Sequence, residues 1–196
     1  MSKQDGWHPV HDVWIMARPK VKYYGAFPAG FLERARILLG VGINDPVLHV
    51  CGGLVKDYPG KRGIGPNDKT LDLDPALNPD YLQDARDPLP IGISHGYNAD
   101  MLLEHHPWGA ILIDRPYSEE DADHYVPGRS VLPSATELVR NALKVLPYGR
   151  RVGILDYVFP SPGVKDGVKL LFVAGVVAGY NNRMRAFTVF EKTERP

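Results

Sequence analysis

The chain alternates between short apolar runs, which have the length of buried strands, and segments in which apolar residues recur at helical spacing. The short runs are residues 47–51, 70–73, 109–113 and 151–155. Helical spacing marks residues 30–39 and 134–146, and Ser134 followed by Glu137 has the composition of a capping box at the start of the second helix. Strands that alternate with helices predict a mostly parallel sheet flanked by helices.

The C-terminal part of the chain has a different pattern. Residues 169–179 and 184–191 are two long β-rich runs, separated by the polar segment Tyr180-Asn181-Asn182-Arg183. Asparagine tolerates left-handed backbone conformations, so this segment favours a turn. The pattern predicts an antiparallel hairpin at the end of an otherwise parallel sheet.

Composition fits one globular α/β domain. The chain has 196 residues, of which 44% are hydrophobic, enough to bury a sizeable core. Its 20 glycines and 18 prolines are spread along the whole length, so no linker divides it. We therefore expect a single domain over residues 1–196, with an N-terminal helical segment in residues 1–45 and the core in residues 46–196.

Charge and cysteine content narrow the classes of function. Basic and acidic residues number 23 each, so no overall field attracts nucleic acid, and a polyanion would have to be met by a local basic cluster such as Arg183 to Arg185. No apolar run approaches the ~20 residues of a membrane span, so no membrane association is expected. The single cysteine, Cys51, excludes an intrachain disulfide and favours the reducing cytoplasm.

Candidate functional residues follow the predicted strands, because ligands of open α/β sheets bind beyond the carboxyl ends of the strands. Cys51-Gly52-Gly53 follows the first strand, and its glycines let a ligand approach the backbone. Asp72 comes about 20 residues later, where nucleotide-binding folds place a carboxylate that accepts from ribose hydroxyls. An ordinary tight turn and a helix-capping acid are the alternative interpretations.

A third acid, Asp84, precedes Ala85 in the loop after the next short strand. At that place a carboxylate can accept a hydrogen bond from the exocyclic amine of an adenine ring. A solvated loop acid is the alternative.

The most informative segment is Asp114-Arg115-Pro116-Tyr117, which follows the buried run of residues 111–113. An aspartate beside a backbone carbonyl holds an amino group by two hydrogen bonds, while a tyrosine stacks on the ring that carries the amine. The alternative is an aspartate that ends a strand, followed by a Pro-Tyr turn.

With these residues in this order, the chain resembles a class I S-adenosylmethionine-dependent methyltransferase over roughly residues 19–192. Asp114-Arg115-Pro116-Tyr117 is similar to the Asp-Pro-Pro-Tyr motif of DNA methyltransferases that act on amino groups. Arg115 replaces the first proline of that motif, and the first loop lacks a full Gly-x-Gly. The backbone carbonyl of Arg115, which would accept from the amine, survives the change.

The resemblance implies a Rossmann-like class I methyltransferase fold with S-adenosylmethionine as cofactor. It places Cys51-Gly52-Gly53 near the methionine moiety, Asp72 on the ribose, Asp84 and Ala85 on the adenine, and the catalytic motif at Asp114, Arg115, Pro116 and Tyr117. Residues 22–31 resemble an N-terminal cofactor-contact segment, for which a hydrophobic staple is the alternative.

The expected function is methyl transfer to an amino nitrogen of a nucleic-acid base such as adenine N6, with DNA as the favoured partner. A small-molecule substrate is the alternative, and a non-catalytic S-adenosylmethionine-binding protein is a third class. The acidic residues 118–125 would repel a phosphate backbone, or form a lid that carries His124 and Tyr125. The length leaves no room for a target-recognition domain, so DNA recognition would need a homodimer or a partner chain.

No metal is expected. The histidines at 105 and 106, and His8 with His11, have no matching distal pair at a recognised ligand spacing.

Overall fold

The computed structural model describes residues 8–21, 26–91, 108–125, 132–178 and 183–194. Its helices are α1 (Phe31–Leu38), α2 (Glu119–Tyr125) and α3 (Ala135–Val145), with short 3-10 turns η1 (Val55–Asp57), η2 (Pro59–Lys61), η3 (Pro75–Leu77) and η5 (Val164–Asp166). The strands are β1 (Val10–Met16), β2 (Val47–Val50), β3 (Lys69–Asp72), β4 (Tyr81–Leu82), β5 (Ala110–Ile113), β6 (Arg151–Asp156), β7 (Val168–Ala178) and β8 (Met184–Lys192).

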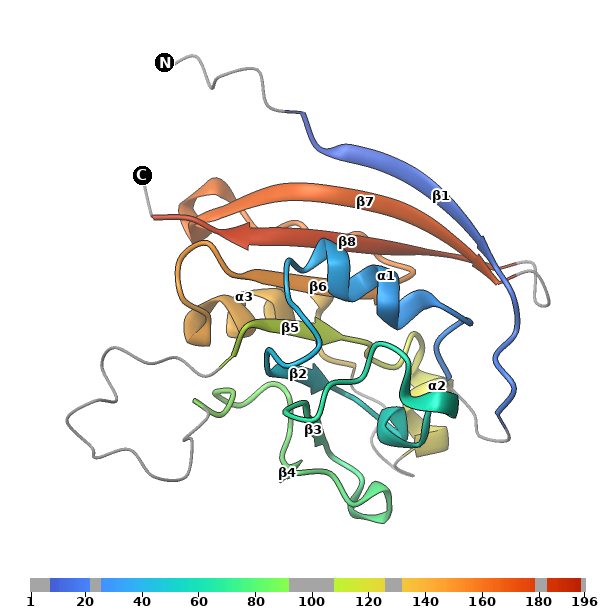
Figure 1. Cartoon of the computed structure of the whole chain (residues 1–196). Helices are drawn as coiled ribbons and strands as arrows, with labels where there is room; N and C mark the ends of the chain where they lie inside the picture. The colour runs from blue at the N-terminus through green and yellow to red at the C-terminus, as the bar shows by residue number, and fades with distance from the viewer. Residues whose placement is uncertain (1–7, 22–25, 92–107, 126–131, 179–182, 195–196) are drawn as a thin grey trace.

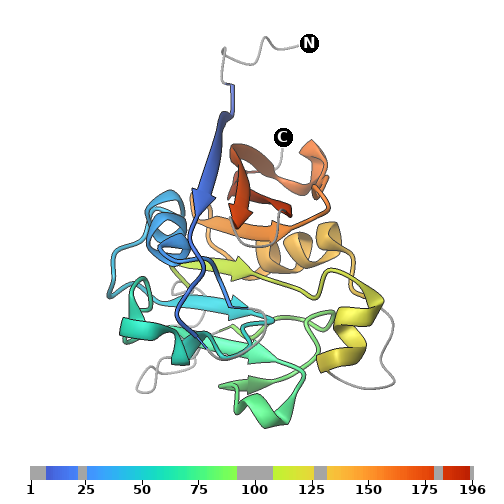
Figure 2. The ribbon, with the colours of Figure 1, turned by 90° about the vertical axis from the view of Figure 1, so that its right-hand side faces the viewer.

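All eight strands form one sheet in the order β1-β7-β8-β6-β5-β2-β3-β4 (Figure 1). Only β8 runs antiparallel to its neighbours, β6 and β7. The predicted strands at β2, β3, β5 and β6 are confirmed, and so is the antiparallel pair near the C-terminus. Figure 2 shows β1 at one end of the sheet and β4 at the other.

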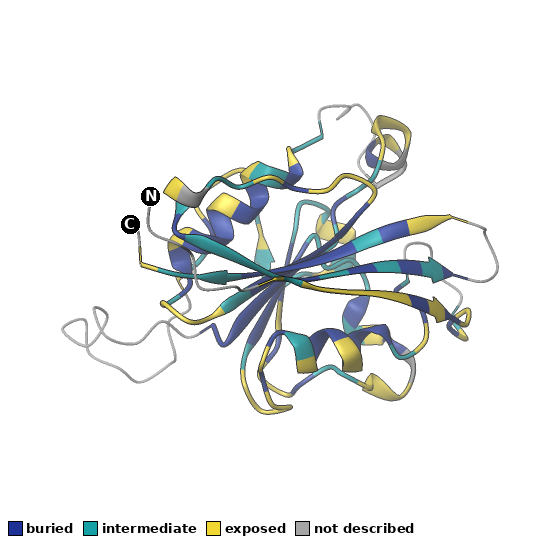
Figure 3. Cartoon of the chain, turned by 90° about the horizontal axis from the view of Figure 1, so that it is seen from above, coloured by how far each residue is buried: buried dark blue, intermediate teal, exposed yellow. Residues whose placement is uncertain are grey.

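Helices α1 and α3 lie on opposite faces of the sheet, so the central strands are buried on both sides (Figure 3). Alternate residues of a strand point to opposite faces. Val47 and Leu112 therefore pack in the cluster with α1, whereas Leu48 and Ile111 pack in the cluster with α3. The same alternation determines whether a residue that directly follows a strand lies on the α1 face or on the α3 face of the sheet.

Strand β1 was not foreseen, so residues 1–45 supply an edge strand as well as a helix. It pairs in parallel with β7, with Trp14 and Met16 buried while Val13 and Ile15 are exposed. The exposed apolar residues hide the alternation by which a strand is recognised. The Trp14 ring lies 5.8 Å from that of Phe187 and 6.2 Å from that of Phe31, which ties β1 to the core.

The capping box predicted at the start of α3 is wrong. Ser134 has the extended backbone of an N-cap, but its side chain makes no capping hydrogen bond. The Ser134 carbonyl accepts from the Leu138 amide, and the Thr136 hydroxyl accepts from the Ser161 amide at 3.0 Å. The helix start is thus fixed by its backbone and by a contact with the loop after β6.

In the segment predicted to contact the cofactor, residues 22–25 lie outside the described residues. The Phe27 and Phe31 rings are buried and stacked, with centroids 5.0 Å apart. The Tyr58 hydroxyl donates to the Pro28 carbonyl at 3.0 Å. The described part of this segment therefore packs the start of α1 onto the core, while its predicted contact with the cofactor stays a prediction.

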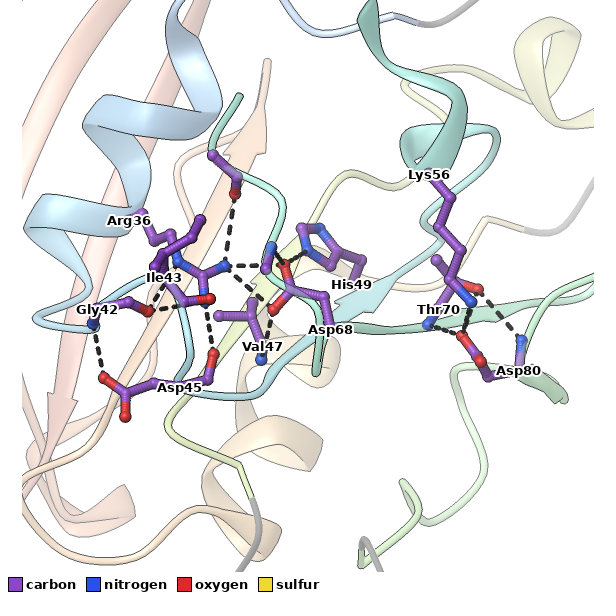
Figure 4. Close-up of polar contacts among 12 residues, drawn as sticks. Arg36, Gly42, Ile43, Asp45, Val47, His49, Lys56, Asp68, Thr70 and Asp80 are labelled. Carbon is purple, nitrogen blue, oxygen red and sulfur yellow. Dashed lines mark hydrogen bonds and ion pairs between the residues drawn. The ribbon is translucent and has the colours of Figure 1, made fainter. Parts of the chain in front are cut away.

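A buried ion pair fastens α1 to the strands beneath it (Figure 4). Arg36 donates from Nη1 to Asp68 Oδ2 at 2.8 Å and from Nη2 to the Gly42 carbonyl at 2.9 Å. His49 Nε2 lies 3.2 Å from Asp68 Oδ2. Burial alone would raise the pKa of Asp68, but the hydrogen bonds from His49, Gly65 and Arg36 lower it.

No helix among the described residues is long and apolar enough to cross a membrane.

Candidate active site

The residues that the sequence analysis singled out lie at one edge of the sheet, the carboxyl ends of its parallel strands. The parallel strands β2, β3, β5 and β6 end there, and the antiparallel β8 begins there, since Ala186 pairs with Asp156 at the end of β6. Residues that follow the parallel strands and residues that open β8 therefore share this edge.

The glycine turn after β2 is tied to the end of β3. The backbone of Cys51 (φ 53°) and Gly53 (φ 51°) is left-handed, and the Gly53 amide donates to Asp72 Oδ2 at 2.9 Å. A Cβ added at Gly53 would meet no atom within 4 Å, so the turn borders open space. Burial raises the pKa of Asp72, opposed by hydrogen bonds from the amides of Gly53, Asp74 and Leu73.

Asp84 and Ala85 follow the short strand β4. Asp84 forms an ion pair with Arg86, whose Nη2 lies 2.6 Å from Oδ2. Ala85 is buried, and its carbonyl accepts from Asn141 Nδ2 of α3 at 3.3 Å. The carboxylate predicted to accept from an adenine amine is thus shared with a neighbouring guanidinium.

The predicted acids converge around Cys51. The pKa of its thiol is raised first by burial and then by the carboxylates of Asp72, Asp114 and Asp84, in decreasing order. Backbone contacts agree with this: Asp72 ends β3 and accepts from the Gly53 amide, its carbonyl accepts from the Gln83 amide of the segment after β4 at 3.0 Å, and Asp114 is hydrogen-bonded to the end of β2.

Asp114 directly follows β5, and its amide donates to the Val50 carbonyl at 3.2 Å. The Tyr117 hydroxyl donates to Oδ1 of its carboxylate, whereas Oδ2 accepts from no residue that the structure describes. Burial raises the pKa of Asp114 to about 6, although the Arg185 charge and the Tyr117 hydrogen bond oppose that shift. Near neutral pH the group is an ionised carboxylate with one oxygen available.

The Arg115 side chain lies on the opposite face of the sheet. It donates from Nε to Asp156 Oδ2 at 2.6 Å and from Nη2 to Asp156 Oδ1 at 3.3 Å, both groups being buried. Its Nη1 donates to the Pro116 carbonyl at 3.1 Å. Arginine at this position of the motif therefore anchors the loop to β6, and its side chain is directed away from Asp114.

Arg185 is the residue of this edge that the sequence interpretation missed, because it was assigned to a basic surface cluster. It is only 8% exposed, and its Nη1 donates to the Tyr117 hydroxyl at 2.6 Å while its Cζ lies 5.4 Å from the Tyr117 ring centroid. The Tyr157 ring meets that of Tyr117 at 4.8 Å and 66°. Burial and the Asp114 charge raise the pKa of Tyr117, so it stays a neutral phenol that donates to Asp114.

The structure describes only part of the remaining sequence candidates. Within the described ranges no group of three His, Cys, Asp or Glu side chains is placed to hold a metal, and the histidines at 105 and 106 lie outside those ranges. The acidic segment forms α2, while the side chains of His124 and Tyr125 are not among the described ones.

Comparisons with known proteins find likeness of fold and not of sequence. No family model matches the chain, and no curated protein matches it. TrmN from Thermus thermophilus is similar in structure with a TM-score of 0.55 at 17% identity, over 86% of this chain and 50% of that one. A candidate hemolysin from Streptococcus thermophilus reaches a TM-score of 0.53 at 12% identity, over 90% of this chain and 70% of that one. An rRNA methylase from Streptococcus thermophilus has a TM-score of 0.47 at 11% identity, over 86% of this chain and 98% of that one.

Strand order and the single antiparallel strand define the class of fold. The chain has the Rossmann-like fold of class I methyltransferases, a mostly parallel sheet flanked by helices with an antiparallel hairpin near its C-terminus. It spans half the length of TrmN.

Proposed function

We propose that this chain is an S-adenosylmethionine-dependent methyltransferase that transfers the methyl group to an amino nitrogen. The observation that carries the proposal is the position of the Asp114 carboxylate, whose Oδ1 accepts from Tyr117 while Oδ2 is available, at the edge where the glycine turn and Asp72 also lie. The class I methyltransferase fold supports the same activity, since its ligands bind at the carboxyl ends of the strands.

The residues present fit the cofactor. Asp72 accepts from the amides of Leu73 and Asp74 at Oδ1 and from the Gly53 amide at Oδ2, so Oδ2 keeps one lone pair to accept from a ribose hydroxyl. The open space at Gly53 admits a ligand against the backbone. Cys51-Gly52-Gly53 would border the methionine moiety. Asp84 and Ala85 would contact the adenine, with Asp84 dividing its oxygens between the adenine amine and Arg86.

The chemistry assigned to this chain is the positioning of the amine. S-adenosylmethionine, when bound, supplies the methyl group, and the sulfur of the cofactor departs as a neutral thioether. The substrate amine donates to Asp114 Oδ2 and to the Arg115 carbonyl, so its lone pair is directed away from both. As positive charge develops on nitrogen, the Asp114 carboxylate stabilises it and takes up the released proton.

Tyr117 has two parts in this proposal. Its hydroxyl holds Asp114 Oδ1 and so leaves Oδ2 for the substrate, while its ring packs against the ring that bears the amine. Pro116 fixes the backbone between the two groups.

The substrate is proposed to be a nucleic-acid base with an adenine-like amine, DNA being favoured by the similarity to the Asp-Pro-Pro-Tyr motif. A homodimer or a partner chain would then supply target recognition. A small-molecule amine is the second candidate. It is favoured by the exposed acids Glu119, Glu120 and Asp123 of α2, which follow the motif and would repel a phosphate backbone.

Incubation with methyl-labelled S-adenosylmethionine and separate pools of DNA, RNA and metabolites tests the activity and the substrate class together. Asp114→Ala should abolish transfer while cofactor binding persists, and Glu194→Gln, an exposed residue beyond the far end of β8, should change neither. Label confined to metabolites would exclude the nucleic-acid version. Cofactor binding without transfer to any pool would indicate the non-catalytic class.

A further inference from the structure

Arg185 lies at the carboxyl ends of the parallel strands, where Asp114 also lies, because β8 runs antiparallel to its neighbours. Its partner across β7 is Val176, and the next residue, Ala186, pairs with Asp156 at the end of β6. Phe187 and Val189, which alternate with it along β8, pack in the cluster with α1. Arg185 therefore points to the α1 face, the face on which Asp114 also lies, and its charge acts on that carboxylate.

The guanidinium of Arg185 is buried but little used by the protein. A guanidinium carries five N–H donors. Among the described residues only the Tyr117 hydroxyl accepts from Arg185. Arg36 and Arg115 are about as buried, and each donates to a buried carboxylate and to backbone carbonyls.

The remaining nitrogens of Arg185 are not sealed inside the core. Within the described part of the chain, the fully buried side-chain atoms without a hydrogen-bond partner are His49 Nδ1 and Thr188 Oγ1. The unbonded nitrogens of Arg185 thus keep access to the space outside the protein. A buried arginine whose remaining donors are still solvent-accessible is arranged to bind an oxyanion such as a carboxylate or a phosphate.

Exposed apolar side chains begin beside the Tyr117 ring, which the guanidinium contacts. Tyr157, Val158 and Phe159 follow β6 and are 41%, 54% and 48% exposed, and the Tyr157 ring touches that of Tyr117. Exposed aromatic side chains next to a buried polar group are typical of sites for planar ligands.

We propose that Arg185 determines substrate specificity by binding an oxyanion carried by the same molecule as the aromatic amine. The inference rests on the proposed function for the identity of the amine, but not for the binding of the oxyanion. The oxyanion has two sources, the carboxylate of an aromatic acid and the phosphate of a nucleotide. Arg185 lies between it and Asp114, so the guanidinium screens the repulsion between the two negative groups.

Binding of simple probes tests this without requiring turnover. Benzoate and phenyl phosphate are titrated into the protein, with benzamide as the uncharged probe of similar shape. A charge-assisted hydrogen bond corresponds to about 10- to 100-fold in affinity, so at least one anion should bind the wild-type protein more tightly than benzamide by that factor. The preferred anion identifies the source.

Arg185→Gln should remove the preference for the anion and leave benzamide binding unchanged. Arg185→Lys should retain part of it, because lysine keeps the charge and loses the planar fork. Arg150→Gln, at the opposite end of β6, is the matched control and should behave as wild type. Urea unfolding of each variant establishes that it is folded.

Equal affinity for all three probes in the wild-type protein would overturn the proposal, as would an equal loss for charged and uncharged probes in folded Arg185→Gln. Either result would mean that Arg185 only positions the Tyr117 side chain. A failure of the methyl-transfer proposal would appear separately, as absence of S-adenosylmethionine binding or of transfer.

Discussion

The raised pKa of Asp114 predicts a specific pH dependence of stability. Its carboxyl group titrates near pH 6 in the folded protein, against an ordinary value of 3.8. The folded state therefore binds this proton more tightly than the unfolded state does. The resulting contribution to stability is fully present below pH 3.8, falls as the pH rises towards 6, and is lost above it.

The size of the effect follows from the shift. A difference of about 2 pKa units corresponds to at most ~3 kcal/mol, and partial contact with solvent reduces this to about 1–3 kcal/mol. Asp114→Asn removes the titration. Between pH 4 and pH 7.5 the wild-type protein should lose about 1–3 kcal/mol more of its free energy of unfolding than the variant does.

Urea unfolding at closely spaced pH values measures both curves. Other shifted groups, such as Asp72 and Asp68, are present in both proteins, so their contributions largely cancel in the difference. Curves that run parallel over this range would show that Asp114 titrates at its ordinary pKa and would refute the reasoning from burial.

Three further outcomes are expected. Arg36→Met leaves the buried Asp68 carboxylate without its guanidinium and should lower the free energy of unfolding by about 3–5 kcal/mol, measured by urea denaturation; an unchanged midpoint would contradict the structural role of the pair. Cys51 should react with iodoacetamide at pH 8 more than about 10-fold more slowly in the folded than in the unfolded protein, and Asp72→Asn should partly restore its reactivity. Gly53→Val should weaken S-adenosylmethionine binding by at least about 10-fold, measured by calorimetry, because valine strains the left-handed backbone of the turn and its side chain enters the space that the glycine leaves open; unchanged affinity would show that the cofactor does not border this turn.

The sequence was sufficient to predict the central strands because they are buried on both faces. Strand β5 appears as a continuous apolar run, so Asp114, which follows it, stands out by contrast. Asp72 was found by its spacing from the glycine turn, since β3 is short and carries polar residues. Their convergence follows from parallel topology alone, since parallel strands end at one edge.

The sequence did not predict the residues that antiparallel pairing, contacts between neighbouring strands or the outermost strand bring into place. Arg185 opens a strand instead of ending one, so a search of strand ends passes over it. The Arg115 to Asp156 ion pair joins two strands whose adjacency no local pattern specifies. Strand β1 is the outermost strand of the sheet, and its exposed residues Val13 and Ile15 are apolar like its buried ones. The sequence of β1 therefore shows no clear alternation of apolar and polar residues.

The central claim is that the residues gathered at the carboxyl edge of the sheet bind S-adenosylmethionine. Calorimetric titration of the wild-type protein, Asp72→Asn and Glu194→Gln with S-adenosylmethionine tests it most directly. The account predicts saturable binding to the wild-type protein and to Glu194→Gln, with affinity at least about 10-fold lower for Asp72→Asn, which lacks the charged acceptor for the ribose hydroxyls. Absence of binding to the wild-type protein, or the same affinity for Asp72→Asn, would contradict it.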